Sequence, residues 1–200
     1  MRLRTLLAIL VAAAVAGCGK SSINTGASTG AASTSEDAVL LSAERRVPAP
    51  SIALSDLNGR KVSTEELKGK PYIVDFWATW CPPCRQEIPH LKELYATYHP
   101  KGLEILGITS AEPLPVVKAF AKDNNLPWPI LVGNEATGRQ FGGIVYLPTA
   151  FLIDGKGRIA QKYVGYTDKK TFEAGIKAVL AEGPSRSARP SQEAGKPRKA

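Results

Sequence analysis

Two cysteines in the middle of the chain, Cys81 and Cys84, are separated by two residues, a spacing typical of thiol–disulfide exchange. The pair lies between an apolar run at 72–77 and a segment with helical periodicity that begins at Pro82. Cys81 is therefore expected at the N-cap of a helix, where unpaired N–H groups and the helix dipole favour the thiolate, the attacking species. Cys84 lies on the same side of the first turn, shielded by the helix. We expect Cys81 to attack a partner's disulfide and Cys84 to displace the product.

Pro82 and Pro83 stand between the two cysteines, and neither has an N–H group. Proline suits the first turn of a helix, but here it removes donors that would stabilise a thiolate at the N-cap. The N–H of Cys84 is then the chief donor left to face the sulfur of Cys81. We expect the pKa of Cys81 to be lowered only modestly, which favours the disulfide and makes the dithiol an electron donor.

Two acidic residues flank the cysteine pair. Asp75 lies in the apolar run six residues before Cys81, and Glu87 follows Cys84 by three residues on the same helical face. A carboxyl group in apolar surroundings has a raised pKa and can take up the proton of Cys84. An Asp in an otherwise apolar strand is costly without such a task. Glu87 has the alternative of being a solvated or capping residue in the first turn of the helix.

The elements that must position these residues alternate between strands and helices. This order predicts an α/β fold in which helices flank a central mixed sheet. Asn58-Gly59 indicates a tight turn within an N-terminal hairpin, because it supplies positive φ angles. We expect strands at 51–57, 60–62, 72–77, 103–109, 149–153 and 158–164, and helices at 63–67, 82–98, 115–125, 135–141 and 168–181.

The N-terminal segment has the pattern of an export signal. Arg2 and Arg4 precede the apolar run 6–16, which is too short to cross a bilayer. The run ends in Val-Ala-Gly-Cys, which resembles the bacterial lipobox, so Cys18 is expected to be lipidated and to become the new N-terminus. The alternative is ordinary signal cleavage after Ala16, which leaves Cys18 as a free thiol.

These patterns divide the chain into four segments. We expect a lipoprotein-type signal peptide at 1–17, a lipidated N-terminus and flexible tether at 18–47, a folded domain at 48–182 and a basic disordered tail at 183–200. The net charge is +8, but the tail alone has five basic residues against one acidic residue. The domain itself is near balance, which argues against nucleic-acid binding by the folded part.

The stretch VDFWATWCPPC resembles the active-site strand and motif of thioredoxin, and residues 48–182 resemble the membrane-tethered TlpA/ResA-type thioredoxin-like proteins of the redoxin superfamily. The resemblance implies a thioredoxin-like fold with an N-terminal hairpin and a central insert near 111–129. It also implies a cis-proline at Pro148 that leaves the backbone of Leu147 free to pair with a substrate peptide. Asp75 matches thioredoxin, whereas ResA-type members often have Asn there, which leaves open which acid is the proton relay. The residues expected around the substrate are Trp80, Pro82, Pro83, Leu147 and Pro148.

The same resemblance implies an extracytoplasmic thiol–disulfide oxidoreductase that reduces protein disulfides, for example in cytochrome c maturation or copper-site assembly. Its expected partners are a disulfide-containing protein, a membrane thiol-electron donor and the membrane itself through the lipid anchor. We expect a monomer that needs no cofactor. The residues leave open the substrate and the direction of electron transfer, so a disulfide-forming oxidant is an alternative.

Three other functions fit less of the sequence. A zinc site needs four ligands, and only His90 and His99 could join the cysteine pair, so no metal is expected. A thiol peroxidase of the peroxiredoxin type shares the lead-in segment, but it needs Thr or Ser three residues before its reactive cysteine. Ala78 and Cys81 occupy those positions for the two cysteines. A non-enzymatic binding lipoprotein leaves the cysteine pair unexplained.

Overall fold

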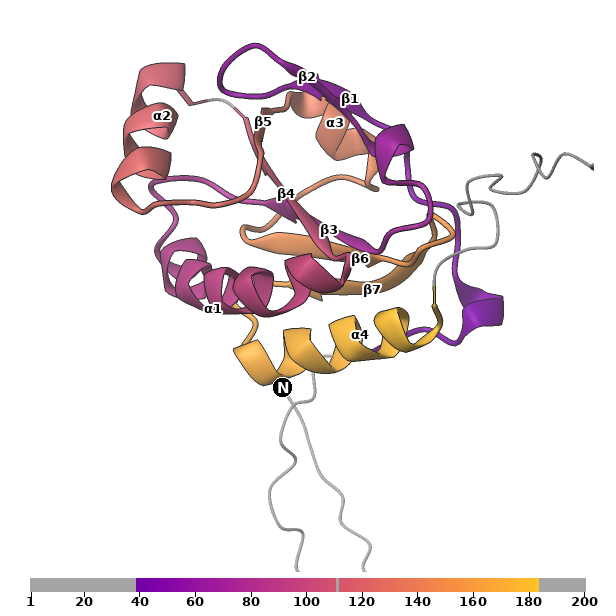
Figure 1. Cartoon of the computed structure of the whole chain (residues 1–200). Coiled ribbons are helices and arrows are strands. Elements are labelled where there is room, and N and C mark those ends of the chain that lie inside the picture. Colours follow the sequence, from indigo (N-terminus) through magenta and orange to yellow (C-terminus); the bar gives the residue numbers. More distant parts are fainter. Residues whose placement is uncertain (1–38, 111, 184–200) are drawn as a thin grey trace, which may run out of the picture. The chain divides into compact units, whose positions relative to one another are not determined.

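A five-stranded mixed sheet forms the centre of the computed structural model, which describes residues 39–110 and 112–183 (Figure 1). The strand order is β5-β4-β3-β6-β7, with β3, β4 and β5 parallel to one another and β6 and β7 antiparallel to their neighbours. The predicted central mixed sheet is therefore confirmed. The strands are β3 (Tyr72–Phe76), β4 (Glu104–Thr109), β5 (Ile130–Val132), β6 (Thr149–Ile153) and β7 (Ile159–Val164).

Helices and a hairpin cover the two faces of this sheet (Figure 1). On one face, α1 (Pro82–Tyr98), α2 (Leu114–Asp123) and α4 (Lys169–Ala181) bury their apolar side chains together with Ile73. On the other face, the hairpin of β1 (Ala53–Ser55) and β2 (Lys61–Ser63) and the end of α3 (Glu135–Gln140) pack against Val74. Because side chains alternate along a strand, Asp75 faces the same way as Ile73, toward α1 and α4.

The helices and strands that match their predicted bounds are those with strong local sequence signals. All five residues of β3 are buried, as expected of a central strand covered on both faces. Helix α1 begins and ends where its periodicity predicts, and β6 has the predicted bounds. Asp168 caps α4 through its side chain, which accepts a hydrogen bond from the N–H of Thr171 at 3.0 Å.

Two local predictions are wrong. The sequence predicts no strand at β5, which has three residues between Pro129 and Gly133 and is recognised only by its pairing with β4. The hairpin turn is also longer than the two residues expected. Gly59 has a positive φ of 83°, but Asn58 does not, and the Asp56 carboxylate accepts the N–H groups of Asn58 and Arg60. The first turn after β2 is the 3₁₀ helix η3 (Thr64–Leu67).

Residues before Pro48 also contact the sheet and the last helix. The short 3₁₀ helix η2 (Ala43–Arg45) precedes the first strand, and the N–H of Leu41 donates to the carbonyl of Ala160 at 2.8 Å. Arg46 is buried and pairs with Asp154 at 3.0 Å and with Glu182 at 2.7 Å. A segment that reads as a solvated tether is thus held by partners more than a hundred residues away.

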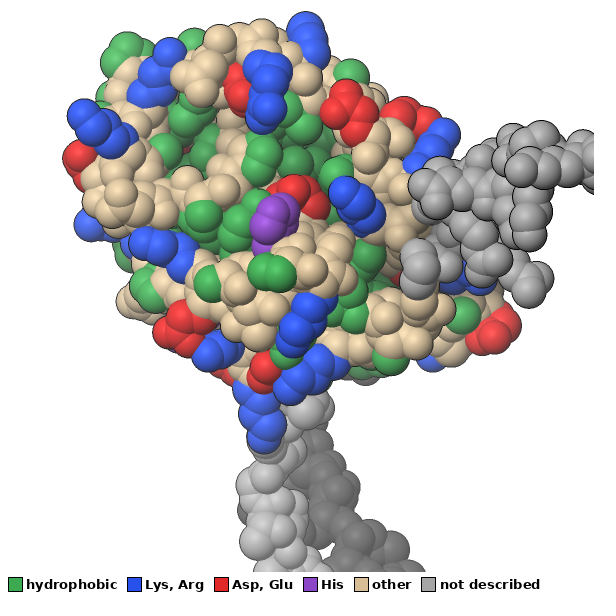
Figure 2. Space-filling view, viewed as in Figure 1, with side chains coloured by type: hydrophobic (Ala, Val, Ile, Leu, Met, Phe, Trp, Pro, Cys, Tyr) green, Lys and Arg blue, Asp and Glu red, His purple; other side chains and the backbone are tan. Residues whose placement is uncertain are grey.

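Several predictions concern residues outside the described ranges. These are the signal peptide, Cys18, the first part of the tether and the basic tail. Within residues 39–110 and 112–183, no helix has the length and apolarity required to span a bilayer. On the face shown in Figure 2, Lys and Arg side chains are interspersed with Asp and Glu, the pattern of an ordinary solvated surface.

Candidate active site

The two cysteines lie at the start of α1 and are joined by a disulfide, with 5.3 Å between their Cα atoms. Cys81 is the N-cap residue, and its sulfur accepts a hydrogen bond from the N–H of Cys84 at 3.2 Å. Pro82 and Pro83 occupy the first two helical positions and contribute no donor. The predicted local geometry, in which one backbone N–H faces the Cys81 sulfur, is confirmed.

The two sulfurs differ in what they face. Each cysteine is only 2% exposed, but Cys81 lines a groove of about 1010 Å³ and Cys84 does not. We call this the active-site groove. A partner's disulfide that enters it meets Cys81 first. The groove is mostly apolar, and its walls include Trp77, Trp80, Pro82 and Pro83 from the motif segment and Ile144, Val145, Tyr146 and Leu147 from the loop before β6.

The loop before β6 brings the predicted proline to this site. The Leu147–Pro148 peptide bond is cis, as the resemblance implies. Thr149 pairs with Phe76 of β3, so Pro148 lies level with the beginning of the motif segment. The carbonyl of Pro148 accepts the N–H of Gly165 at 2.8 Å. Neither backbone group of Leu147 is hydrogen-bonded within the described part of the chain, which leaves both available at the edge of the groove.

Asp75 and Glu87 are both buried on the α1 side of β3. Glu87 is 1% exposed and accepts a hydrogen bond from the N–H of Thr167 at 2.8 Å, so it is neither a solvated nor a capping residue. Burial raises the pKa of Glu87, the charge of Asp75 raises it further, and the Thr167 N–H opposes both. Burial also raises the pKa of Asp75, whose Oδ1 has no hydrogen-bond partner in the described residues. The two acids therefore form a coupled pair that favours the protonated state.

A tyrosine on β7 extends this buried polar cluster. The hydroxyl of Tyr163 donates to Gln161 Oε1 at 3.0 Å, and burial together with the charge of Glu87 raises the pKa of Tyr163. Gly175 of α4 lies directly over these groups. A Cβ at that position would stand 2.5 Å from the Tyr163 hydroxyl and 2.7 Å from Gln161 Oε1. The absence of a side chain at 175 lets α4 close over the cluster.

Glu112 is a residue of the site that the sequence analysis missed. Its carboxylate accepts hydrogen bonds from the N–H of Thr79 at 3.1 Å, from the hydroxyl of Thr79 and from the hydroxyl of Thr109 at 2.8 Å. It therefore ties the segment after β4 to the motif segment two residues before Cys81. Only its place in the predicted insert could have drawn attention to it, because Thr79 lies 33 residues earlier in the sequence.

The two histidines lie apart from each other on or next to α1. His99, just after the helix, stacks on Tyr95 with 4.4 Å between ring centroids, and its Nδ1 lies 3.1 Å from the carbonyl of Leu103. His90 lies within the helix, where its ring is 5.9 Å from that of Tyr166. In the described residues, no group of three or more His, Cys, Asp and Glu side chains could hold a metal ion.

Comparisons with known proteins agree on one family. Residues 46–162 match the AhpC/TSA family. The thiol-disulfide oxidoreductase ResA of Bacillus thuringiensis subsp. konkukian is 36% identical over 131 residues, which cover 66% of this chain and 76% of that protein. The ResA of Geobacillus thermodenitrificans is 35% identical over 131 residues, with coverage of 66% and 75%.

Solved structures extend the likeness to the fold. A thiol:disulfide interchange protein of the thioredoxin family from Chlorobium tepidum superimposes with a TM-score of 0.64 at 38% identity and covers 68% of this chain and 97% of its own. A secreted thiol-disulfide isomerase from Corynebacterium glutamicum, at 21% identity, gives a TM-score of 0.68 with coverage of 72% and 91%, which supports the fold alone. The chain has a thioredoxin-like fold, belongs to the AhpC/TSA family and, within it, is a thiol–disulfide oxidoreductase of the TlpA/ResA type.

Proposed function

We propose that the chain is an exported, lipid-anchored reductant of protein disulfides. The observation that carries this proposal is the asymmetry of the pair: Cys81 lines the active-site groove and caps α1, whereas Cys84 lies behind it on the first turn. Such an arrangement gives one sulfur that meets the substrate and one that completes the exchange.

The reaction then has two steps. The Cys81 thiolate attacks a sulfur of the substrate disulfide, which forms a mixed disulfide and releases the first substrate thiolate. Cys84 gives its proton to a nearby carboxylate, and the resulting thiolate attacks Cys81 Sγ. The internal disulfide forms as the second substrate thiolate leaves. Two electrons pass from the enzyme to the substrate, and each departing thiolate takes up a proton from water.

Glu87 and Asp75 are proposed to manage the proton of Cys84. Each is a buried carboxyl group with a raised pKa, so it accepts a proton more readily than a solvated acid does. Glu87 lies one turn after Cys84, where the Thr167 N–H fixes its orientation. Asp75 has no comparable anchor and raises the pKa of Glu87 through its charge. We assign the transfer to the two carboxyl groups as a unit. Glu87, with its pKa raised to about 9, holds a proton at neutral pH, and Asp75, with its pKa raised to about 7, keeps a carboxylate fraction that can accept the proton of Cys84.

The direction of electron flow follows from what surrounds the Cys81 sulfur. In the first turn of α1 it receives one backbone N–H, that of Cys84, because Pro82 and Pro83 have none. A thiolate with few donors is weakly stabilised, so the disulfide is favoured relative to the dithiol and the dithiol gives up its electrons. This supports a reductant over a disulfide-forming oxidant.

The substrate is proposed to bind as an extended peptide beside the disulfide. The free N–H and C=O of Leu147, held in place by the cis bond to Pro148, would pair with the peptide backbone as an added strand does. Trp80, which is 68% exposed, and the rings of Pro82 and Pro83 would contact its apolar side chains. An unfolded or loosely folded protein with an accessible disulfide meets these requirements.

Location and partners complete the proposal. The signal-like segment 1–17 and Cys18 support export and lipid anchoring. The substrates proposed are the haem-attachment cysteines of an apocytochrome c or a copper-site assembly protein, and a membrane thiol protein would return the electrons. The domain is proposed to act as a monomer without a cofactor. Mass analysis of wild-type and Cys18→Ser protein from membranes tests the anchor, and acylation of both would contradict it.

A trapping experiment tests the function directly. With Cys84→Ser, attack by Cys81 still occurs but the mixed disulfide cannot be resolved. We expect this variant to accumulate a covalent adduct with reduction-sensitive exported proteins, whereas Cys81→Ser gives none. Insulin reduction with dithiothreitol should be supported by wild type alone. Equal trapping by both variants would contradict the proposed roles, and rapid consumption of hydrogen peroxide would favour a thiol peroxidase.

A further inference from the structure

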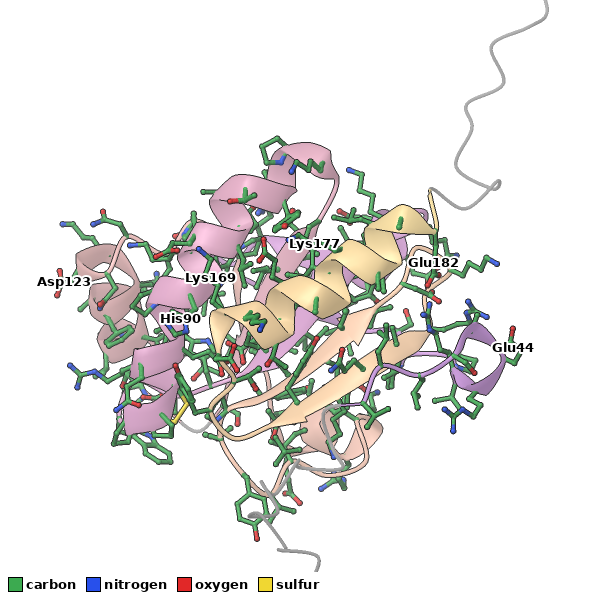
Figure 3. The ribbon with its side chains drawn as sticks, turned by 90° about the horizontal axis from the view of Figure 1, so that it is seen from below. Glu44, His90, Asp123, Lys169, Lys177 and Glu182 are labelled. Carbon is green, nitrogen blue, oxygen red and sulfur yellow. A yellow bond between two sulfur atoms is a disulfide. The ribbon has the colours of Figure 1, made fainter. Side chains whose placement is uncertain are left out.

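The active-site groove is larger than an exchange between sulfur atoms requires. Its volume of about 1010 Å³ would hold a whole small ligand, yet the reacting atom that it contains is the sulfur of Cys81. Figure 3 shows the disulfide at the beginning of α1, and the groove runs from there to α3 and the loop that follows it. Because the groove is continuous with Cys81, its occupant is the chain that brings the disulfide. The remaining volume is therefore available to other side chains of that chain.

The floor of the groove is apolar and fixed in position. Phe76 and Ile108 line it, are paired across β3 and β4, and are both buried. The ring of Phe76 also packs edge-on against that of Phe141, with 5.3 Å between ring centroids. A floor that is part of the core keeps its shape when a side chain enters, so little binding energy is lost to reorganisation.

One wall of the groove, which we call the α3 wall, consists of Gly138, Ile144 and Val145. Gly138 lies inside α3 without a positive φ, so its backbone does not demand glycine, and glycine there costs helix stability. A Cβ at 138 would make only ordinary contact with Ile144, at 3.5 Å. The glycine thus leaves open space beside Ile144. Val145 is 81% exposed, which makes it an apolar side chain that a bound substrate would cover.

The charged residues of the groove are already paired with each other. In the described part of the chain, those that line the groove are Glu135 and Arg139, which form an ion pair one turn apart on α3. A charged substrate side chain would lose hydration in the groove without gaining a free partner. A large apolar side chain gains free energy when it is buried there. The α3 wall therefore favours an apolar side chain.

The geometry of an added strand decides which substrate residue reaches the α3 wall. The substrate backbone is proposed to pair with Leu147 while its cysteine faces Cys81. Side chains alternate along a strand, so the residues next to that cysteine point away from the groove. The residues two positions from it point into the groove, roughly 7 Å along the chain. Val145 precedes Leu147 by the same two-residue step, which places the α3 wall within reach of one of them.

We propose that the α3 wall is a specificity subsite for a large apolar side chain two positions from the attacked cysteine. The substrate class is then an unfolded segment in which one residue of any type separates the cysteine from the apolar residue. Gly138 determines the preference, because the space that it leaves open is the space that the substrate side chain fills. The inference rests on the proposed function and adds a sequence preference to it.

Single-turnover reduction of synthetic peptides measures this preference. Each short Ala/Ser peptide has a central cysteine joined by a disulfide to 2-mercaptoethanol and is mixed in excess with reduced enzyme. Quenching with an alkylating reagent gives the second-order rate constant. We expect Phe two positions from the cysteine, on one side only, to raise this constant roughly tenfold relative to Ala. Phe next to the cysteine, or Glu or Lys two positions away, should change it by less than about twofold.

Substitutions in the wall are judged by the ratio of the Phe and Ala rate constants, which cancels any general loss of activity. Gly138→Leu fills the open space with a residue that suits a helix, so the ratio should fall to near one. Ala136→Leu is the matched control, because Ala136 is exposed on the same helix and does not line the groove. Val145→Ser removes an exposed side chain and should also lower the ratio, whereas Val47→Ser, exposed outside the groove, should not.

Three results would overturn the proposal: no advantage of Phe at either position, an equal advantage next to the cysteine, or a wild-type ratio in Gly138→Leu. A concentration-dependent dimer in sedimentation that Val145→Ser abolishes would assign the wall to a second copy of the chain and would overturn it as well. If the wild-type enzyme reduced none of the peptides, the proposed function would fail instead.

Discussion

Replacement of Glu87 by Gln should make the oxidised protein more stable than wild type, and this difference should grow as pH rises. Burial raises the pKa of Glu87 above its ordinary value of 4.5, to about 9. Between these two values the folded protein binds a proton that the unfolded chain has released, so wild-type stability falls as pH increases. Each pH unit costs about 1.4 kcal/mol. From pH 4.5 to pH 7 the cost reaches at most about 3 kcal/mol, and an uncharged Gln avoids it.

The Gln variant keeps the local geometry, because its side-chain oxygen can still accept the Thr167 N–H. Urea unfolding of both proteins at pH 5, 6, 7 and 8 measures the difference. We expect the free energies of unfolding to be close at pH 5 and to diverge steadily above it, with Glu87→Gln the more stable. Glu93→Gln on the same helix is the control, since Lys169 lowers the pKa of Glu93 and the divergence should be absent. Parallel pH profiles for wild type and Glu87→Gln would refute the reasoning.

Three further substitutions test other contacts of the fold and the site. Gly175→Ala places a methyl group against the Tyr163 hydroxyl, so overpacking should lower the free energy of unfolding by about 1–3 kcal/mol in urea titrations; unchanged stability would contradict this. Glu112→Ala leaves three hydrogen-bond donors unpaired, so we expect insulin-reduction activity to fall and the free energy of unfolding to decrease by about 1–3 kcal/mol. The activity and stability of Glu112→Gln should lie between those of wild type and Glu112→Ala. Full activity in both variants would contradict a positioning role. Arg46→Ala breaks a buried ion pair, so it should lower the free energy of unfolding by about 3–5 kcal/mol and make the first described residues accessible to protease. An unchanged cleavage pattern would contradict this anchoring.

The sequence predicted best where the signals are local. The apolar run of β3, the capping residue and periodicity of α1 and the Asp168 cap of α4 each depend on a few neighbouring residues, and each agrees with the structure. The donor left to the Cys81 sulfur could also be predicted, because proline chemistry is independent of context.

Features that depend on distant partners could not be predicted. Arg46 reads as part of a solvated tether because its carboxylate partners, Asp154 and Glu182, lie more than a hundred residues away. Strand β5 has too few residues to show a period and exists through its pairing with β4. For the same reason Glu112 was missed, since two of its three hydrogen bonds come from Thr79, which lies 33 residues earlier in the sequence.

The buried acids fall between these cases. Composition alone marked Asp75 as costly in its strand, and spacing placed Glu87 near Cys84. Neither could reveal that the N–H of Thr167 holds Glu87 from eighty residues away, nor that the charge of Asp75 raises the pKa of Glu87. The disulfide lies at one end of the described domain, and Glu44 and Glu182, near its two described termini, lie at the other (Figure 3).

The reduction potential of the Cys81–Cys84 pair tests the central claim most directly. Purified protein equilibrated in graded dithiothreitol buffers and quenched with a thiol-alkylating reagent gives the fraction of disulfide at each potential. Because the Cys81 thiolate has few hydrogen-bond donors, we expect a reversible two-electron transition. Its midpoint potential should lie nearer the thioredoxin value of about −270 mV than the value of about −120 mV for a strong oxidant such as DsbA. A transition close to the latter value, or no reversible transition between these two sulfurs, would contradict the account.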